Sequence, residues 1–384
     1  MTPPVTPAIE PFEIHVDDLV LDDLGDRLAA TRFPDEIDDS WDAGIPMGYL
    51  RELVEYWRDG YDWRAEEARL NAQANFRTEI DGQQIHFVHA RSAHDDALPL
   101  LLIHGWPGSI VEFLDVIPRL TDPERHGGRA ADAFHVVVPS LPGYGFSEPT
   151  RTPGWDPTRI AQAFIELMDR LGYPRYAAQG GDWGAQVTTR IGALDPQHCV
   201  AIHLNMPIAA PPAEPVALSA EEEADLAAFR QFQREESAYS LEQGTKPQTV
   251  GVALNDSPAG LLAWIVEKFR AWSDCDGDPE NVFTRDQLLT NVMLYWVTRT
   301  ITSSARLYRE ARLSDRRDGA PQYVGVPTGV ARYPKEILRF PRAWVEQRYN
   351  VTHWAVMPRG GHFAAMEQPA LFVDDVRTFF GTVR

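Results

Sequence analysis

Residues 176–185 read Tyr-Ala-Ala-Gln-Gly-Gly-Asp-Trp-Gly-Ala, and they predict a short buried strand that turns abruptly into a helix. The turn places Asp182 among small residues, with glycine at positions 180, 181 and 184. A turn of this kind lifts one side chain above the end of a sheet, and its neighbours must be small because the backbone there is tight and strained. We therefore expect Asp182 to be displayed at the end of a strand, in the position of a reactive group.

The displayed residue selects the chemistry. A carboxylate is a poor reagent for ester or amide carbonyls, but it attacks a saturated carbon that carries a strained or good leaving group, and the covalent ester that forms must then be cleaved by water. Asp182 therefore points to displacement at an sp3 carbon, such as an epoxide carbon or a carbon that bears a halogen. The alternative is that Asp182 is only the N-cap of a helix that starts near Trp183.

The composition is that of an ordinary soluble globular protein. The chain has 384 residues, 44% of them hydrophobic, and its 36 basic and 56 acidic residues give a net charge of −20. This negative charge argues against nucleic acid or an anionic membrane surface as a partner. The sequence lacks an apolar run of the ~20 residues that a membrane span needs, and its first residues lack a signal-peptide pattern. We therefore expect a cytoplasmic protein, and the widely separated Cys199 and Cys275 predict no disulfide framework.

From residue 76 onward, strands alternate with helices. Asp81-Gly82 is a two-residue hairpin signal between alternating strands at 76–80 and 84–89. Further strands are expected at 98–103, 134–138 and 200–204, and helices at 110–120 and 157–171. This alternation implies right-handed βαβ crossovers and a mostly parallel sheet, so the expected fold class is α/β.

The chain divides into segments of different character. The first eleven residues are proline-rich and predict a flexible lead. Residues 209–321 contain helical segments and no convincing strand, which predicts a helical cap over the carboxyl edge of the sheet. The sheet resumes near 323–326 and 351–357, and a helix at 370–380 closes the domain. The expected organisation is an N-terminal extension at 1–75, a core in two parts at 76–208 and 322–384, and a cap at 209–321.

His362 follows the last predicted strand, where the nucleophile–acid–histidine order of α/β-hydrolases places the general base. A histidine after two glycines is often only structural, but a nucleophile upstream favours the catalytic interpretation. An acidic residue must orient this base. Glu336 follows the preceding strand at loop distance, whereas Asp315 and Asp318 come before that strand and suggest a solvated charged loop. A surface glutamate at a helix start remains the alternative for Glu336.

Two loops could supply an oxyanion hole. The string His-Gly-Trp-Pro at 104–107 follows an early strand, and the backbone N–H groups of Trp106 and Trp183 would be the donors. The alternative is a plain strand-to-helix turn. An epoxide oxygen also needs a proton donor as its ring opens, and tyrosine hydroxyls supply one without adding a charged group. The predicted cap helices carry Tyr239, Tyr295 and Tyr308, and their spacing leaves open which of them faces the cleft.

Several strings together form the pattern of a known family. They are His-Gly-Trp-Pro-Gly-Ser at 104–109, Pro-Ser-Leu-Pro-Gly-Tyr-Gly-Phe-Ser at 139–147, Gly-Gly-Asp-Trp-Gly at 180–184, Thr-Lys-Pro-Gln-Thr-Val-Gly at 245–251, Leu-Asn-Asp-Ser-Pro at 254–258 and Arg-Gly-Gly-His-Phe-Ala-Ala-Met-Glu at 359–367. Through these, and an N-terminal stretch of matching residues from Phe33 to Gly82, the chain resembles the microsomal-type epoxide hydrolases, including the juvenile-hormone epoxide hydrolases. The resemblance covers nearly the whole chain and implies an α/β-hydrolase fold in a soluble bacterial member that lacks the membrane anchor of animal members.

The resemblance also implies a role for each matched residue. These are Asp182 as nucleophile, His362 as base, Glu336 as its acidic partner, Tyr239 and Tyr308 as ring-opening tyrosines, and Trp106 and Trp183 as oxyanion-hole donors. The implied reaction converts an epoxide and water to a vicinal diol without a metal or other cofactor. The apolar and aromatic cap suggests a bulky hydrophobic substrate, in detoxification or in secondary metabolism. The size and acidity of the chain favour a homodimer.

Three other functions are compatible with this fold class. A haloalkane dehalogenase shares the aspartate nucleophile, but Trp106 stands where many dehalogenases carry asparagine, and the cap carries tyrosines. A non-catalytic ligand-binding homologue would usually lose a member of the triad, and every member is present. A serine esterase is excluded because Ser140 and Ser147 lie outside the turn pattern that displays a nucleophile.

Overall fold

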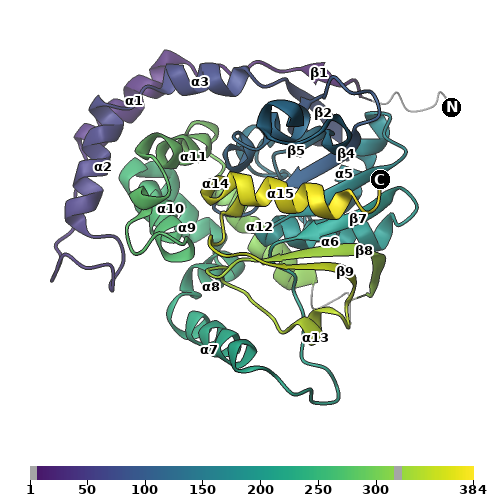
Figure 1. Cartoon of the computed structure of the whole chain (residues 1–384). Coiled ribbons are helices and arrows are strands. Elements are labelled where there is room, and N and C mark those ends of the chain that lie inside the picture. Colours follow the sequence, from purple (N-terminus) through teal and green to yellow (C-terminus); the bar gives the residue numbers. More distant parts are fainter. Residues whose placement is uncertain (1–6, 315–321) are drawn as a thin grey trace.

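The structure, a computed structural model, describes residues 7–314 and 322–384. Within these residues the strands are β1 (Glu10–Pro11), β2 (Asn75–Ile80), β3 (Gln83–Ala90), β4 (Leu98–Ile103), β5 (Phe134–Pro139), β6 (Tyr176–Gly180), β7 (Cys199–Leu204), β8 (Val324–Arg332) and β9 (Tyr349–Val356). They form one sheet in the order β1-β2-β3-β5-β4-β6-β7-β8-β9 (Figure 1). The neighbours β1–β2, β2–β3 and β3–β5 are antiparallel. The other neighbours, β5–β4, β4–β6, β6–β7, β7–β8 and β8–β9, are parallel, which confirms an α/β fold with a mostly parallel sheet.

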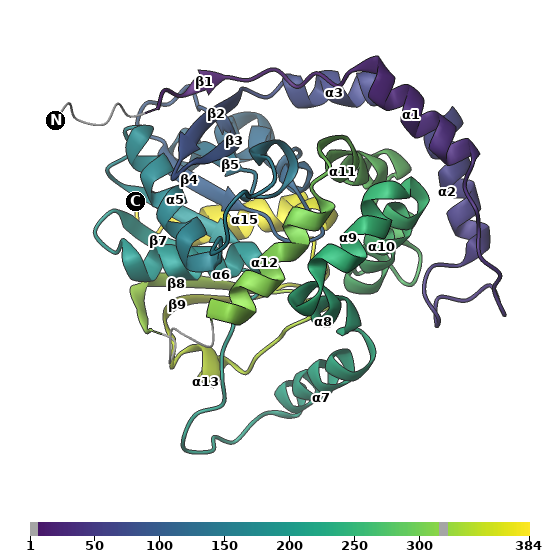
Figure 2. The ribbon, with the colours of Figure 1, turned by 180° about the vertical axis from the view of Figure 1, so that it is seen from behind.

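Helices cover both faces of this sheet. The core helices are α4 (Ile117–Thr121), α5 (Pro157–Arg170), α6 (Asp182–Leu194), α13 (Arg342–Val345), α14 (Ala364–Glu367) and α15 (Pro369–Phe380), with short 3-10 helices η1 (Ile110–Phe113), η2 (Pro123–His126), η3 (Ala130–Asp132) and η4 (Gly145–Ser147). Helices α5 and α6 lie on one face and α15 lies on the other (Figure 1, Figure 2). Strands β4, β5 and β6 are therefore buried on both sides, as their continuous apolar runs predict.

A second group of helices lies between β7 and β8 in the chain. It contains α7 (Ala220–Glu235), α8 (Ala238–Thr245), α9 (Pro247–Asp256), α10 (Pro258–Trp272), η5 (Pro279–Asn281), α11 (Arg285–Thr298) and α12 (Ile301–Ser314). As predicted, residues 209–314 contain no strand. Helices α8 to α12 gather against one end of the sheet, and α7 lies apart from them (Figure 1). The loop after β4 contacts α11 directly, because Asn291 Nδ2 donates to the carbonyl oxygen of Pro107 at 2.7 Å, so these helices cover the carboxyl edge of the sheet.

The N-terminal helices brace the second group from outside. Helices α1 (Asp18–Ala29), α2 (Met47–Asp59) and α3 (Trp63–Asn71) form an arc around it (Figure 2). The hydroxyl of Tyr56 donates to Asp286 at 2.8 Å, and the hydroxyl of Tyr61 lies 3.0 Å from that of Thr290, so both bonds reach α11. The first strand also belongs to this segment, because Glu10 and Pro11 pair with β2, where the sequence had predicted only a flexible lead.

Two predicted elements differ from the structure, and a proline lies in or directly after each of them. The helix expected at 110–120 is η1 followed by the short α4, because Pro118 cannot donate a hydrogen bond within a continuous helix and disfavours helical backbone at the residue before it. The strand expected at 323–326 extends to Arg332 as β8, although Pro327 lies inside it. The hairpin around Asp81-Gly82 and the strand at 98–103 are confirmed, whereas Asp315 and Asp318 lie outside the described residues.

Cys199 and Cys275 are both free and buried, as expected for a chain without a disulfide framework. Among the described residues, no single helix has the length and apolar character to cross a membrane; α9 and α10, a pair bent by 116°, meet those two criteria only when taken together.

Candidate active site

Asp182 lies at the junction of β6 and α6 with a backbone φ of 49°, in the left-handed region that few residues other than glycine adopt. Close packing requires a small neighbour, because a Cβ at position 184 would lie 1.9 Å from the carbonyl oxygen of Ile103 in β4. The N-cap of α6 is Gly181, and the Asp182 carboxylate is turned toward the loop after β4. The N-cap interpretation of Asp182 is therefore wrong.

Two backbone N–H groups stabilise the Asp182 carboxylate. The N–H of Trp106 donates to Oδ1 at 2.7 Å, and the N–H of the adjacent Trp183 also favours the charged form of the carboxylate. Burial raises the pKa of Asp182 above its ordinary value, while the charge of His362 and these two N–H groups oppose that rise. The two donors therefore stand where negative charge on an oxygen of residue 182 would develop.

The loop that carries Trp106 is held from the core and from α11. His104 lies between the carbonyl oxygen of Gly105, 2.9 Å from Nδ1, and the N–H of Leu141, which donates to Nε2 at 3.1 Å. Both ring nitrogens are thus engaged, and burial lowers the pKa of His104 to about 4, so the ring is neutral. From α11, the hydroxyl of Tyr295 donates to the carbonyl oxygen of Gly108 at 2.7 Å. Tyr295 therefore supports this loop, which distinguishes it from the other two cap tyrosines considered above.

His362 connects Asp182 to Glu336. Its Nδ1 lies 2.6 Å from Glu336 Oε1, and its Nε2 lies 3.6 Å from Asp182 Oδ2. Glu336 is 1% exposed and also accepts the N–H of Ile337 at 2.7 Å, so the surface interpretation of Glu336 is wrong. Burial disfavours the charged imidazole, but the carboxylates of Glu336 and Asp182 outweigh burial and raise the pKa of His362 to about 9. The imidazole is therefore protonated at neutral pH.

A buried carboxylate that the sequence did not single out holds the backbone around His362. Glu367 accepts the N–H groups of Gly361 and Phe363, both at 2.9 Å, and that of Asp274 after α10 at the same distance. The N–H of His362 itself donates to the carbonyl oxygen of Trp272 at 2.9 Å. The histidine loop is thus fixed to the helices that cover the sheet. Glu367 ends the string Arg-Gly-Gly-His-Phe-Ala-Ala-Met-Glu, but no local pattern shows that three N–H groups converge on it.

Tyr239 in α8 and Tyr308 in α12 lie over the same carboxylate. The ring of Tyr239 stacks on Trp106 with centroids 5.1 Å apart, and Tyr308 meets Trp183 edge to face at 4.8 Å. The two tyrosine rings are 5.9 Å apart. Burial, together with the nearby charge of Asp182, raises the pKa of both hydroxyls well above the ordinary value, so both remain protonated donors.

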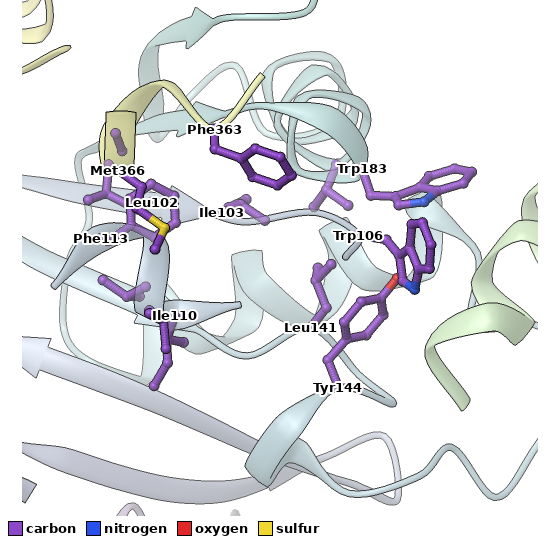
Figure 3. Close-up of a cluster of buried hydrophobic side chains, with 14 of the residues drawn as sticks. Leu102, Ile103, Trp106, Ile110, Phe113, Leu141, Tyr144, Trp183, Phe363 and Met366 are labelled. Carbon is purple, nitrogen blue, oxygen red and sulfur yellow. The ribbon is translucent and has the colours of Figure 1, made fainter. Parts of the chain in front are cut away.

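The walls of the site are aromatic. The indoles of Trp106 and Trp183 lie at one side of a buried cluster and point away from Leu102 and Phe113 (Figure 3). Trp272 packs against both Tyr239 and His362, with ring centroids 5.1 Å apart in each pair. All seven residues predicted for the site are therefore brought together around Asp182. The arrangement combines a largely buried carboxylate, a protonated imidazole and two neutral hydroxyl donors inside an apolar enclosure.

Sequence comparison with known proteins gives a consistent family. A family model described as "Epoxide hydrolase N terminus" matches residues 9–113, and one described as "alpha/beta hydrolase fold" matches residues 99–257. A Stigmatella aurantiaca protein, provisionally named an epoxide hydrolase, is 52% identical over 380 residues, which cover 98% of this chain and 86% of that protein. Epoxide hydrolase 1 of Sus scrofa is 39% identical over 405 residues, which cover 97% of this chain and 89% of that protein.

Solved structures extend the similarity to the whole fold. Juvenile hormone epoxide hydrolase from Bombyx mori has a TM-score of 0.91 and 35% identity, covering 98% of this chain and 95% of that one. Aspergillus niger epoxide hydrolase has a TM-score of 0.88 and 35% identity, covering 98% and 97%. The similarity therefore includes the N-terminal helices, the sheet and the helices that cover its edge. With this agreement in sequence and structure along nearly its entire length, the chain belongs to the epoxide hydrolase family, within the α/β-hydrolase fold.

Proposed function

We propose that this protein hydrolyses a bulky hydrophobic epoxide to a vicinal diol through a covalent ester on Asp182. The observation that carries the proposal is the position of the Asp182 carboxylate, which lies between the Trp106 N–H on one side and the His362 imidazole on the other. Tyr239 and Tyr308 lie over it, as ring opening requires. The aromatic walls favour an apolar substrate because they offer large surfaces for packing and few competing polar groups.

In the first half-reaction, Asp182 Oδ2 attacks an epoxide carbon and the carbon–oxygen bond of the strained ring breaks. The hydroxyls of Tyr239 and Tyr308 donate hydrogen bonds to the leaving oxygen, which needs stabilisation as its negative charge develops. Their raised pKa favours donation over loss of the proton to solvent. That oxygen becomes a hydroxyl by taking the proton of one of the two tyrosines, which solvent then replaces, and the product of this step is a glycol ester of Asp182.

In the second half-reaction, His362 takes a proton from water, and the water oxygen attacks Cγ of Asp182. Esterification removes the negative charge of Asp182, which is one of the causes that raise the pKa of His362. The pKa of His362 therefore falls in the ester, which favours release of its proton to solvent and formation of the neutral imidazole, the form that can accept a proton from water. The Trp106 and Trp183 N–H groups stabilise the tetrahedral oxyanion, each by about 3–4 kcal/mol in comparable sites.

The first test is diol release from styrene oxide and bulkier aryl epoxides by the wild-type protein. We expect a vicinal diol at a rate proportional to enzyme concentration. Halide release from bromoalkanes without diol would favour the dehalogenase reading. Saturable binding of an aryl epoxide without turnover would favour the non-catalytic reading, and either result would reject the proposal.

Replacing the two tyrosines with phenylalanine tests the first half-reaction. We expect Tyr239→Phe and Tyr308→Phe each to slow ester formation by about 10- to 100-fold, and the double variant to slow it further, because general-acid assistance contributes on the order of 10²–10⁴-fold. Rapid-quench measurement of the ester gives this rate directly. Tyr323→Phe is the matched control, because Tyr323 is 53% exposed and lies before β8. Loss of activity in the control, or wild-type ester formation in the double variant, would contradict these roles.

We further propose that the chain is organised as an N-terminal extension at 1–75, a two-part core at 76–208 and 322–384, and a cap at 209–321 that encloses the substrate. Hydrogen bonds from the N-terminal helices to α11 support a bracing role for the extension. We also propose that the protein acts in the cytoplasm as a homodimer, as its charge and size favour.

A further inference from the structure

Glu112 is a partly buried carboxylate beside the active site, and neither half-reaction gives it a role. It lies in η1, on the loop that continues from Trp106. A Cβ at Gly108 would lie 1.7 Å from Glu112 Oε1, just as a Cβ at Gly105 would lie 2.2 Å from Asp182 Oδ1. The two carboxylates therefore pack against two glycines of one short loop, where larger residues could not be accommodated.

Glu112 shares a small cavity with Asp182 and His362. This cavity has about 10 Å³ for the centre of a water molecule, which is close to the room that one water needs. Other polar side chains that line it are Gln179, at the end of β6, and Asn205, directly after β7. Its size therefore suits a single water molecule in contact with the reacting groups.

The cavity contains one acceptor that lacks a donor. Gln179 is 1% exposed, and its Nε2 donates to Asn205 Oδ1 at 3.3 Å. Its Oε1 has no hydrogen-bond partner among the described residues. A buried acceptor without a donor costs about 1–3 kcal/mol, and a water molecule is the small donor that fits. Gln179 and Glu112 thus offer two acceptors on the walls of a cavity that also contains the base.

Charge couples Glu112 to the same two residues. Burial raises the pKa of Glu112 to about 8, and the negative charge of Asp182 adds to that rise. The charge of His362 and the N–H groups of Ser109 and Gly105 oppose it. In return, Glu112 helps to raise the pKa of His362. A change in the charge of Asp182 or His362 is therefore felt at Glu112.

We propose that Glu112 and Gln179 hold the water molecule that hydrolyses the ester. This role rests on the proposed function. With His362 protonated, the water accepts from Nε2 and donates to Glu112 and to Gln179 Oε1. In the ester, one O–H turns to the neutral Nε2 of His362 while the other remains on a carboxyl oxygen of Glu112, and a lone pair of the water is directed at Asp182 Cγ.

The bonds and protons in this step balance. The water oxygen forms a bond to Asp182 Cγ as one of its protons moves to His362 Nε2. The tetrahedral intermediate then collapses, the bond between Cγ and the glycol oxygen breaks, and that oxygen takes the proton from His362. The remaining proton of the water returns to solvent as Asp182 regains its carboxylate. Glu112 and Gln179 make and break only hydrogen bonds.

Glu112→Gln separates this role from simple support of the loop. Because Trp106 and Trp183 adjoin Asp182, intrinsic fluorescence in a stopped-flow experiment can follow both formation and decay of the ester. We expect ester formation to stay within about twofold of wild type and ester hydrolysis to slow by about tenfold or more, since a positioned acid–base partner contributes on that order. Both kcat and KM should fall, kcat/KM should stay nearly constant, and the ester should accumulate in intact-mass spectra.

Asp115→Asn is the matched control. It removes one carboxylate from the same part of the chain, but Asp115 accepts from Arg69 of the N-terminal extension at 3.1 Å, outside the cavity. We expect both half-reactions of this variant to match wild type. Gln179→Met removes the second acceptor at similar volume and should slow hydrolysis in the same selective way. If Glu112→Gln shows no cooperative melting transition and is therefore not folded, Gln179→Met tests in its place whether these residues hold the water.

Two outcomes would overturn the inference. Unchanged ester hydrolysis in Glu112→Gln and Gln179→Met would mean that these residues do not hold the water. An equal loss in both half-reactions, with a matching fall in kcat/KM, would mean that Glu112 only supports the loop. Failure of the proposed function itself has a different signature, because the wild-type protein would then form neither diol nor an ester on Asp182.

Discussion

Asp182→Ala eliminates diol formation from every epoxide that the wild-type protein hydrolyses. We expect kcat to fall by about four to six orders of magnitude, in the range seen when the nucleophile of a covalent mechanism is removed. Alanine leaves the two tyrosines and the oxyanion-hole donors in place, but no atom remains to attack the epoxide carbon. Quantifying the diol by chromatography, with the epoxide well above KM, measures the loss.

The fold should survive this substitution. The carboxylate of Asp182 is largely buried, and burial raises its pKa, so its interactions with His362 and the N–H donors partly offset the loss of hydration. Asp195→Asn is the matched control, because Asp195 caps the other end of α6 and accepts the hydroxyl of Tyr176 at 2.9 Å, which asparagine can also accept. Retained diol formation in Asp182→Ala would reject Asp182 as nucleophile, whereas loss of activity in Asp195→Asn would indicate damage to the helix.

Local sequence was enough to locate Asp182 and His362 in the fold. Each lies in the turn or loop that follows a strand, and the order of elements along the chain brings the carboxyl ends of parallel strands to one edge. Glu336 could be placed for the same reason, although the strand before it is longer than predicted. Gly325, Pro327 and Gly329 lie inside that strand, and they weaken the β pattern on which such a prediction depends.

Residues whose importance comes from tertiary packing could not be found in this way. Tyr239, Tyr295 and Tyr308 all lie on predicted helices, and only the packed arrangement shows that the hydroxyl of Tyr295 donates to Gly108. The same holds for Glu112 and Glu367. Each is an acidic residue in or beside a short helix, where an exposed position is the usual expectation. Glu112 is partly buried because its loop turns back so that Gly108 packs against it, and Glu367 is buried beside Asp274, which is distant in sequence.

His362→Gln should stop the reaction after the first half. Asp182 and the two tyrosines remain, so the ester can form, but glutamine cannot take a proton from water. We expect ester hydrolysis to slow by about two to four orders of magnitude, the usual contribution of a general base. One equivalent of epoxide should be consumed in a burst, and intact-mass spectra should show the protein heavier by the mass of one epoxide. Peptide mapping should place the adduct on the peptide that contains Asp182.

The pH dependence of the burst adds a second, independent check on this variant. In the wild-type protein the charge of His362 lowers the pKa of Asp182 against the effect of burial. Without that charge the pKa of Asp182 rises further, so the carboxyl stays protonated, and unable to attack, up to a higher pH than in the wild-type protein. As the pH is lowered, ester formation in His362→Gln should therefore decline at a higher pH than ester formation in the wild-type protein. His94→Gln, which alters a partly exposed histidine paired with Glu124, should turn over as wild type. Steady turnover in His362→Gln would show that His362 is not the base. An adduct on any other peptide would contradict the ester mechanism, because Asp182 is the carboxylate that lies beside His362 Nε2.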